Sequence, residues 1–151
     1  MAGSGWTNRG KQRVMAIALA GETPPTNFYW ALVTSASAPG PDTNTKSELT
    51  EVANGNGYTT GGIVKARNAT NFPFVEDDTN DWTLADPPDL AWTASGGSIP
   101  ASGSPPHYLI LTDDNATQGS REVWFYHDLA SDPTVPVGQV FTIANPLIKA
   151  A

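Results

Sequence analysis

The chain contains no cysteine, and among its 151 residues only two are histidine and eight are lysine or arginine. The lack of cysteine excludes disulfide bonds, thiolate nucleophiles and cysteine-ligated zinc or iron–sulfur sites. Fifteen aspartate and glutamate residues outnumber the cations and give a formal net charge of −7. Because three of the cations are Arg9, Lys11 and Arg13, the rest of the chain is more acidic still. We therefore expect no nucleic-acid groove.

Long apolar runs are also missing. The longest run near the start, Val14 to Ala20, is too short to span a membrane, so no membrane association is expected. Basic residues before this run also fit a short signal peptide, but an ordinary helix is the better interpretation. Thr7 or Asn8 can cap its start and Gly21 its end. Gly10 weakens the first turn, so the predicted helix begins at about Lys11.

Short apolar and aromatic runs follow, separated by turn residues. Glycine and proline, 14 and 13 in number, are spread between these runs instead of forming one linker. This pattern predicts one mainly β domain over residues 1–151, an antiparallel β-sandwich or barrel with a short N-terminal arm and helix at about residues 1–21. The expected strands are Asn27–Thr34, Ile63–Ala69, Leu90–Thr93, His107–Thr112, Glu122–Leu129 and Gln139–Ile143, with Glu48–Val52 and Trp82–Ala85 as weaker candidates.

No residue pattern indicates a catalytic centre. A Gly-x-Ser-x-Gly motif is missing, and neither His107 nor His127 has an evident orienting partner, since Asp128 points away from His127 on a strand. The glycine-rich segment 55–62 lacks the Gly-Lys-Ser/Thr ending of a phosphate-binding loop, and we interpret it as a turn before the Ile63 strand. We therefore expect no enzyme and no cofactor.

The acidic segment Glu76–Asp81, continued by Asp86 and Asp89, is the best candidate for metal binding. Carboxylates are suitable calcium ligands. Trp82, however, occupies the position at which an EF-hand loop needs glycine, and no glutamate closes the loop. Solvated turns use the same residues without a metal, so no metal site is predicted, and calcium binding remains an open alternative.

The N-terminal segment is the predicted partner-binding element. Trp6 lies ahead of the helix and outside the strand pattern, where an exposed tryptophan can insert into a partner's pocket. Together with Arg9, Lys11 and Arg13 it forms the candidate binding set. The long loops Ser35–Lys46, Ser95–Pro106 and Asp113–Ser120 are the second candidate surface.

Several phrases of the sequence resemble small structural proteins of tailed bacteriophages. They run in order over most of the chain: NFYWALVTSA at residues 27–36, GNGYTTGG at 55–62, WTASGG at 92–97, YLILTDDN at 108–115 and REVWFYHDL at 121–129. The resemblance implies a virion protein made in the host bacterial cytoplasm. It also implies a capsid decoration or cement role on the outer head surface.

The partners that this resemblance implies are the major capsid protein and further copies of the chain, in a homo-oligomer such as a trimer. In this interpretation the segment Met1–Arg13 and the long loops contact the capsid. Two alternatives stay open. One is a structural protein of the tail or neck, and the other is a carbohydrate-binding β-sandwich with exposed tryptophans.

Overall fold

The chain folds mainly into antiparallel β-sheets, as the computed structural model shows for residues 3–150. Strands account for 36% of the structure and helix for 13%. Every strand pair is antiparallel. The prediction of a mainly β, sandwich-like fold with one short N-terminal helix is therefore confirmed.

A five-stranded sheet forms one layer. Its strand order is β1 (Gly5–Trp6), β8 (Val123–Asp128), β7 (Pro106–Thr112), β2 (Asn27–Thr34) and β3 (Ile63–Ala66). The central strand β2 is rich in aromatic and β-branched residues, which pack well on a pleated surface. Both of its faces are buried: Trp30 and Leu32 lie in the main core, and Ala31 and Val33 in a second cluster on the other face.

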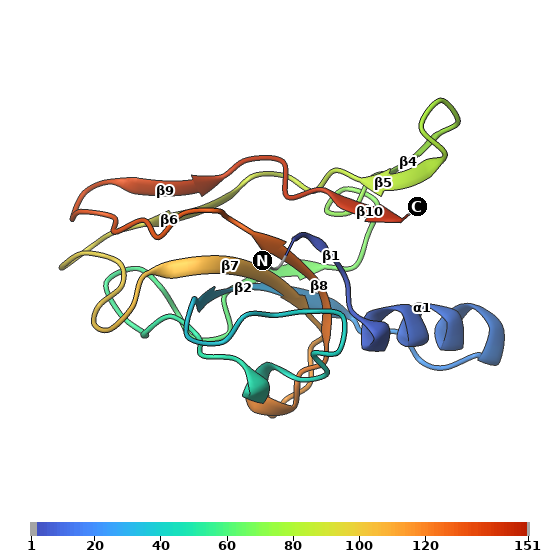
Figure 1. Ribbon diagram of the computed structural model, residues 1–151, viewed down its shortest axis with the longest axis horizontal. Helices are drawn as coiled ribbons and strands as arrows, with labels where there is room; N and C mark the ends of the chain where they lie inside the picture. Colours follow the sequence, from blue (N-terminus) through green and yellow to red (C-terminus); the bar gives the residue numbers. More distant parts are fainter. Residues whose placement is uncertain (1–2, 151) are drawn as a thin grey trace.

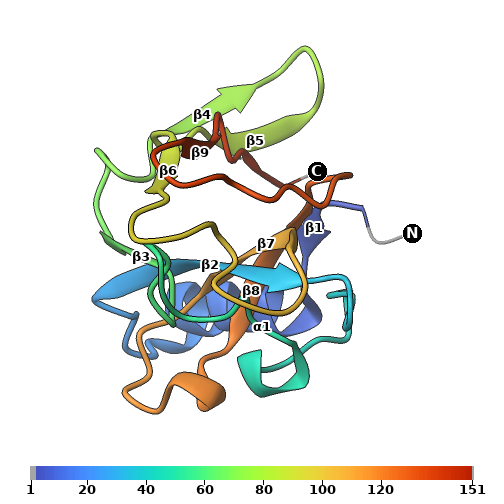
Figure 2. The same cartoon turned by 90° about the vertical axis from the view of Figure 1, so that its left-hand side faces the viewer.

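Two smaller sheets form the other layer, which lies above the five-stranded sheet in Figures 1 and 2. One has the order β10 (Ile148–Ala150), β5 (Trp82–Ala85) and β4 (Phe74–Asp77), and the other pairs β6 (Leu90–Thr93) with β9 (Val140–Ile143). The main core fills the space between the layers with residues from both, among them Trp30, Leu109, Leu90, Trp92 and Ile148.

The single helix, α1, spans Asn8–Ala20. The Thr7 side chain caps its start by accepting from the Gly10 N–H at 2.8 Å, and Gly21 ends it in the left-handed conformation. The predicted start at Lys11 was wrong. Gly10 is instead required within the first turn, because a Cβ there would lie 2.3 Å from the backbone oxygen of Trp124.

The start of α1 is fixed to an irregularity in β8. The β7–β8 register shifts between Leu111 and Thr112, so Leu111 faces Phe125 and Thr112 faces Val123, which leaves Trp124 as the extra residue of a β-bulge. The Thr7 N–H donates to the Trp124 carbonyl at 3.0 Å. The Thr7 hydroxyl also donates to the Val123 carbonyl, so the start of α1 is attached to β8 by backbone and side chain.

Three strands were not predicted: β1, β4 and β10. Each is short and depends on a partner strand for its hydrogen bonds. The weaker candidate Glu48–Val52 was wrong as a strand, since Lys46–Glu48 forms a turn of 3₁₀ helix and only Glu51 bridges to Val33.

Candidate functional site

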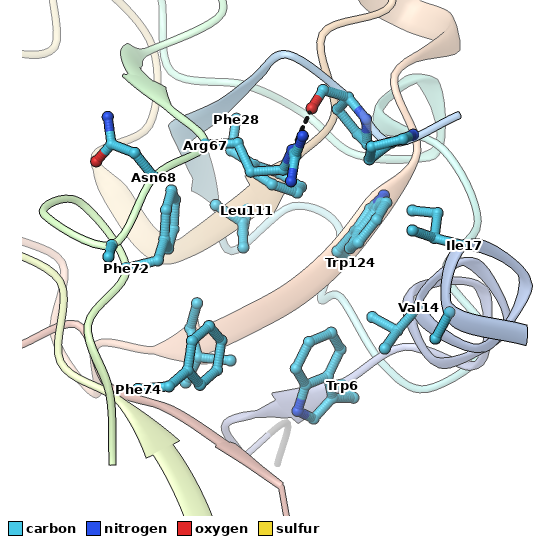
Figure 3. Close-up of a pocket in the computed structure, with 15 residues that line it drawn as sticks. Trp6, Val14, Ile17, Phe28, Arg67, Asn68, Phe72, Phe74, Leu111 and Trp124 are labelled. Atoms are coloured by element: carbon cyan, nitrogen blue, oxygen red, sulfur yellow. Dashed lines mark hydrogen bonds between the residues drawn. The ribbon is translucent and has the colours of Figure 1, made fainter. Parts of the chain in front are cut away.

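An apolar groove of about 500 Å³ lies between α1 and the turn that precedes β4 (Figure 3). Val14, Ile17 and Ala18 of α1 line one side of it, and Phe72 and Phe74 line the other. The sheet contributes Phe28, Leu111 and Trp124, and the chain ends contribute Trp6 and Ile148. We call this surface the apolar groove.

The groove is open to solvent although its lining is mostly hydrocarbon. Phe74 is 63% exposed and Val14 is 42% exposed. The Trp124 indole N–H is buried and has no acceptor among the described residues. An exposed apolar surface next to an unused donor is typical of a site that contacts another molecule.

Arg67 is the single charged residue among those that line the groove. Its Nε donates to the carbonyl of Pro25 at 2.8 Å, which is the hydrogen bond drawn in Figure 3. This bond holds the arginine at the edge of the groove. No carboxylate lines the groove, so the side-chain chemistry present there supports binding and offers no general acid or base.

Trp6 is not the exposed arm that the sequence predicted. It pairs with Phe125 in the β1–β8 ladder, and its ring packs edge-on against the Phe125 ring at a centroid distance of 5.5 Å. Its indole N–H donates to the Lys149 carbonyl at 2.7 Å. The side chain is half-buried and lines the apolar groove, so Trp6 forms part of a surface and does not reach out as a free anchor.

The three predicted basic residues have different roles. Arg9 and Arg13 both pair with Glu122, at 2.5 Å and 3.0 Å, and Arg13 also contacts Glu22. They therefore attach α1 to the start of β8. Lys11 is exposed and lies in a hollow that adjoins the apolar groove, together with Trp6, Val14 and Met15. The binding set predicted around Trp6 is thus divided between structural and accessible residues.

The long loops do not act as one surface. Ser35–Lys46 and Asp113–Ser120 meet at one end of the molecule, where Lys46 Nζ donates to Gln118 Oε1 at 3.3 Å. The third loop, Ser95–Pro106, contributes to the core. Its Ile99 is fully buried and exchanges two backbone hydrogen bonds with Val135. The loops Ser35–Lys46 and Asp113–Ser120 therefore form one continuous surface that a partner can contact, whereas Ser95–Pro106 partly belongs to the core.

The two histidines have different surroundings. His127 Nδ1 lies 3.2 Å from the Ser4 hydroxyl, but its buried Nε2 has no partner among the described residues. Burial lowers the pKa of His127 to about 4, against a smaller opposing effect of the Pro146 carbonyl. This makes it a weak base at neutral pH. His107, for which no orienting partner was evident from the sequence, has two carboxylates beside it: Asp132 Oδ1 lies 2.8 Å from its Nδ1 and Asp128 Oδ1 lies 3.5 Å from its Nε2.

The glycine-rich segment is a turn that serves a buried polar network. Gly61 and Gly62 both have positive φ, as glycine allows. The network is centred on the Glu51 carboxylate. The Tyr58 hydroxyl donates to this carboxylate at 2.7 Å, and the buried Lys46 ammonium lies 2.5 Å from it. Burial is the main cause that raises the pKa of Tyr58 above its usual value. These groups satisfy each other, so no phosphate or catalytic role follows from them.

The acidic segment forms the β4–β5 hairpin. Asp77 organises its turn by accepting from the Asn80 side-chain amide, from the backbone N–H groups of Thr79 and Asn80 and from the Trp82 indole. These hydrogen bonds, that of the Asn80 amide above all, lower the pKa of Asp77. Among residues 3–150 no group of three or more histidines or carboxylates is placed to hold a metal ion. All five tryptophans are at least half-buried.

No helix among the described residues is long and apolar enough to cross a membrane. Comparison of the chain with protein-family models, with curated proteins and with solved structures gave no match.

The apolar groove itself was missed at the sequence level. The sequence predicts a helix from the apolar run Val14 to Ala20, but no apolar surface that faces this helix was recognised. The signal was available in the segment Phe72-Pro73-Phe74-Val75, an apolar run directly before the acidic turn. The strand β4, which directly follows Pro73, was not among the predicted strands, although proline is tolerated at the first positions of a strand.

Proposed function

We propose that this chain is a non-catalytic structural protein of a bacteriophage particle, acting as a decoration or cement protein on the outer head surface. The observation that carries the proposal is the open apolar groove between α1 and β4, which has no carboxylate or nucleophile in its lining. Such a surface is suited to contact with another protein. The resemblance of several sequence phrases to phage structural proteins supports the particle context.

The two loops that meet at Lys46 and Gln118 supply a second contact surface. A cement protein must bridge several neighbours, and two separate surfaces on one rigid domain allow this. In the proposed arrangement the loop surface contacts the major capsid protein and the apolar groove mediates contacts within the decoration layer. The N-terminal helix serves as one side of the groove.

Co-sedimentation with phage heads tests the proposal. Purified protein is mixed with expanded, undecorated heads at micromolar concentration, and the pelleted fraction is measured as a function of protein added. We expect saturable pelleting, with hundreds of copies per head. Heads that already carry their decoration are the control and should bind little.

A lack of pelleting at micromolar concentration would overturn the head assignment. Binding at a low, ring-like copy number to the neck or tail would instead place the protein there. Counting the copies per particle separates these structural roles.

A further inference from the structure

Five cations among residues 3–150 have no carboxylate within 4.0 Å: Lys11, Lys65, Arg67, Arg121 and Lys149. Arg121 stacks on the Tyr29 ring and Lys149 on the Trp82 ring, and the other three belong to the groove or its surroundings. Arg67 lines the groove and Lys11 lines the adjoining hollow. Lys65 stands opposite Phe28 in the β2–β3 ladder, so it shares the sheet face of this groove residue. Within residues 3–150 none of the three has a carboxylate within 4.0 Å, whereas Arg9, Arg13 and Lys46 each do.

This charge distribution defines the chemistry of the occupant. The chain has fifteen acidic residues, yet none lines the apolar groove or the adjoining hollow. An apolar surface bordered by free cations is complementary to a segment that combines large apolar side chains with carboxylates. The occupant must therefore be both hydrophobic and acidic.

The same chain displays a segment of this kind. The β4–β5 hairpin projects from the molecule at the upper right of Figure 1. Phe74 and Val75 at its base are 63% and 57% exposed, although they point to opposite faces of the strand. The exposed carboxylates of Glu76 and Asp78 follow directly. β4 is also the edge strand of its sheet, so one side of its backbone is free to pair.

We propose that the apolar groove receives the β4–β5 hairpin of a second copy of this chain. In this contact Phe74 and Glu76, which share one face of β4, lie against the groove. Phe74 covers the apolar lining, and the carboxylates of Glu76 and Asp78 face Arg67, Lys65 and Lys11. The inference rests on the proposed function, since it names the partner that the groove takes. Phe74 borders the groove of its own copy, whereas Glu76 and Asp78 lie outside the groove lining, so the two surfaces adjoin and the contacts close either by two-fold exchange or as a ring.

Sedimentation velocity of the full chain, from low micromolar to near-millimolar concentration, tests the proposal. We expect a concentration-dependent oligomer. Phe74→Asp should weaken its association by roughly tenfold or more, because it places a charge in the apolar contact. Val137→Asp is the matched control, since Val137 is 61% exposed and precedes β9, a strand that contributes no residue to the groove or the adjoining hollow. Phe74→Ala, which removes the ring without adding a charge, is a second test should Phe74→Asp fail to fold, which circular dichroism reports.

Charge-reversal variants test whether the β4–β5 hairpin and the apolar groove contact each other. Glu76→Lys with Asp78→Lys reverses the hairpin, and Lys11→Glu with Lys65→Glu reverses the groove. Each double variant should be monomeric alone, and a mixture of the two should associate, because the reversed hairpin now matches the reversed groove. Failure of the mixture to associate while the wild type does so would show that other surfaces form the oligomer and would overturn the proposal.

A wild-type chain that stays monomeric at near-millimolar concentration would equally overturn self-docking. The head-binding assay is independent of this result. Monomeric protein that still pellets with heads would refute the further inference and leave the proposed function standing. A protein that forms the oligomer but does not pellet with heads would refute the proposed function and leave the self-docking inference standing.

Discussion

Similar apolar residues are buried in the five-stranded sheet and exposed in the small sheet that contains β4. In the five-stranded sheet, β2 carries Trp30 and Leu32 on one face and Ala31 and Val33 on the other, and all four are fully buried. In the small sheet, β4 carries Phe74 and Val75 on its two faces, and both are more than half exposed. Hydrophobic residues alone therefore do not mark the core. We call the five-stranded sheet with the main core the closed side, and it stabilises the fold. We call the region of β4, α1 and the apolar groove the open side, and it is available for contact with another molecule.

The largest expected effect compares the two sides directly. Trp30→Ala should reduce the free energy of unfolding by about 3–5 kcal/mol, because it removes a fully buried ring from the main core. Phe74→Ala should cost less than about 1 kcal/mol, since most of its ring is in solvent. Urea unfolding at submicromolar concentration measures both without interference from association. Equal losses for the two variants would show that Phe74 belongs to the core and that the distinction is false.

The second prediction concerns pH and the closed side. His127 packs near the rings of Trp30 and Phe125, and burial lowers its pKa to about 4, below its ordinary 6.5. The unfolded chain therefore binds a proton more readily than the folded one. The stability from this group is complete above pH 6.5 and is lost as the pH falls toward 4, by about 3 kcal/mol in total.

Urea unfolding at a series of pH values, together with the NMR titration of His127, measures this effect. In His127→Gln the fall in stability between pH 6.5 and 4 should be smaller, because the titrating group is gone. A His127 resonance that titrates near its ordinary pKa would contradict the prediction.

The sequence was sufficient for the closed side and insufficient for the open side. Asn27–Thr34 and Leu90–Thr93 were predicted to the residue, because each is a run of strand-forming residues bounded by turn signals. β1 and β10 have two and three residues, and they are strands only because β8 and β5 pair with them. Such pairing depends on residues distant in sequence. For the same reason the sequence showed Trp6 as a free anchor, whereas the fold places it against Phe125.

The third prediction tests the junction between the two sides. Gly10→Ala should destabilise the protein by about 1–3 kcal/mol, because the new methyl group would overlap the Trp124 backbone and displace α1. Gly3→Ala is the control, since nothing lies within 4 Å of a Cβ there. Displacement of α1 should also alter the environment of Trp124, which fluorescence reports. An unchanged stability for Gly10→Ala would mean that α1 is not fixed to the bulge.

The smallest expected effects on stability come from replacing the cations of α1. They distinguish residues that attach α1 to β8 from residues that contact a second copy of the chain. Arg9→Ala removes an ion pair with Glu122 whose arginine is 44% exposed, so we expect a loss of less than about 1 kcal/mol. Lys11→Ala should leave stability unchanged, because Lys11 has no ion-pair partner among the described residues. In the sedimentation assay we expect the opposite ranking of the two variants: Lys11→Ala should weaken self-association, and Arg9→Ala should leave it unchanged. If both variants affected only stability, the groove edge would be structural, and the open side would lose its separate role.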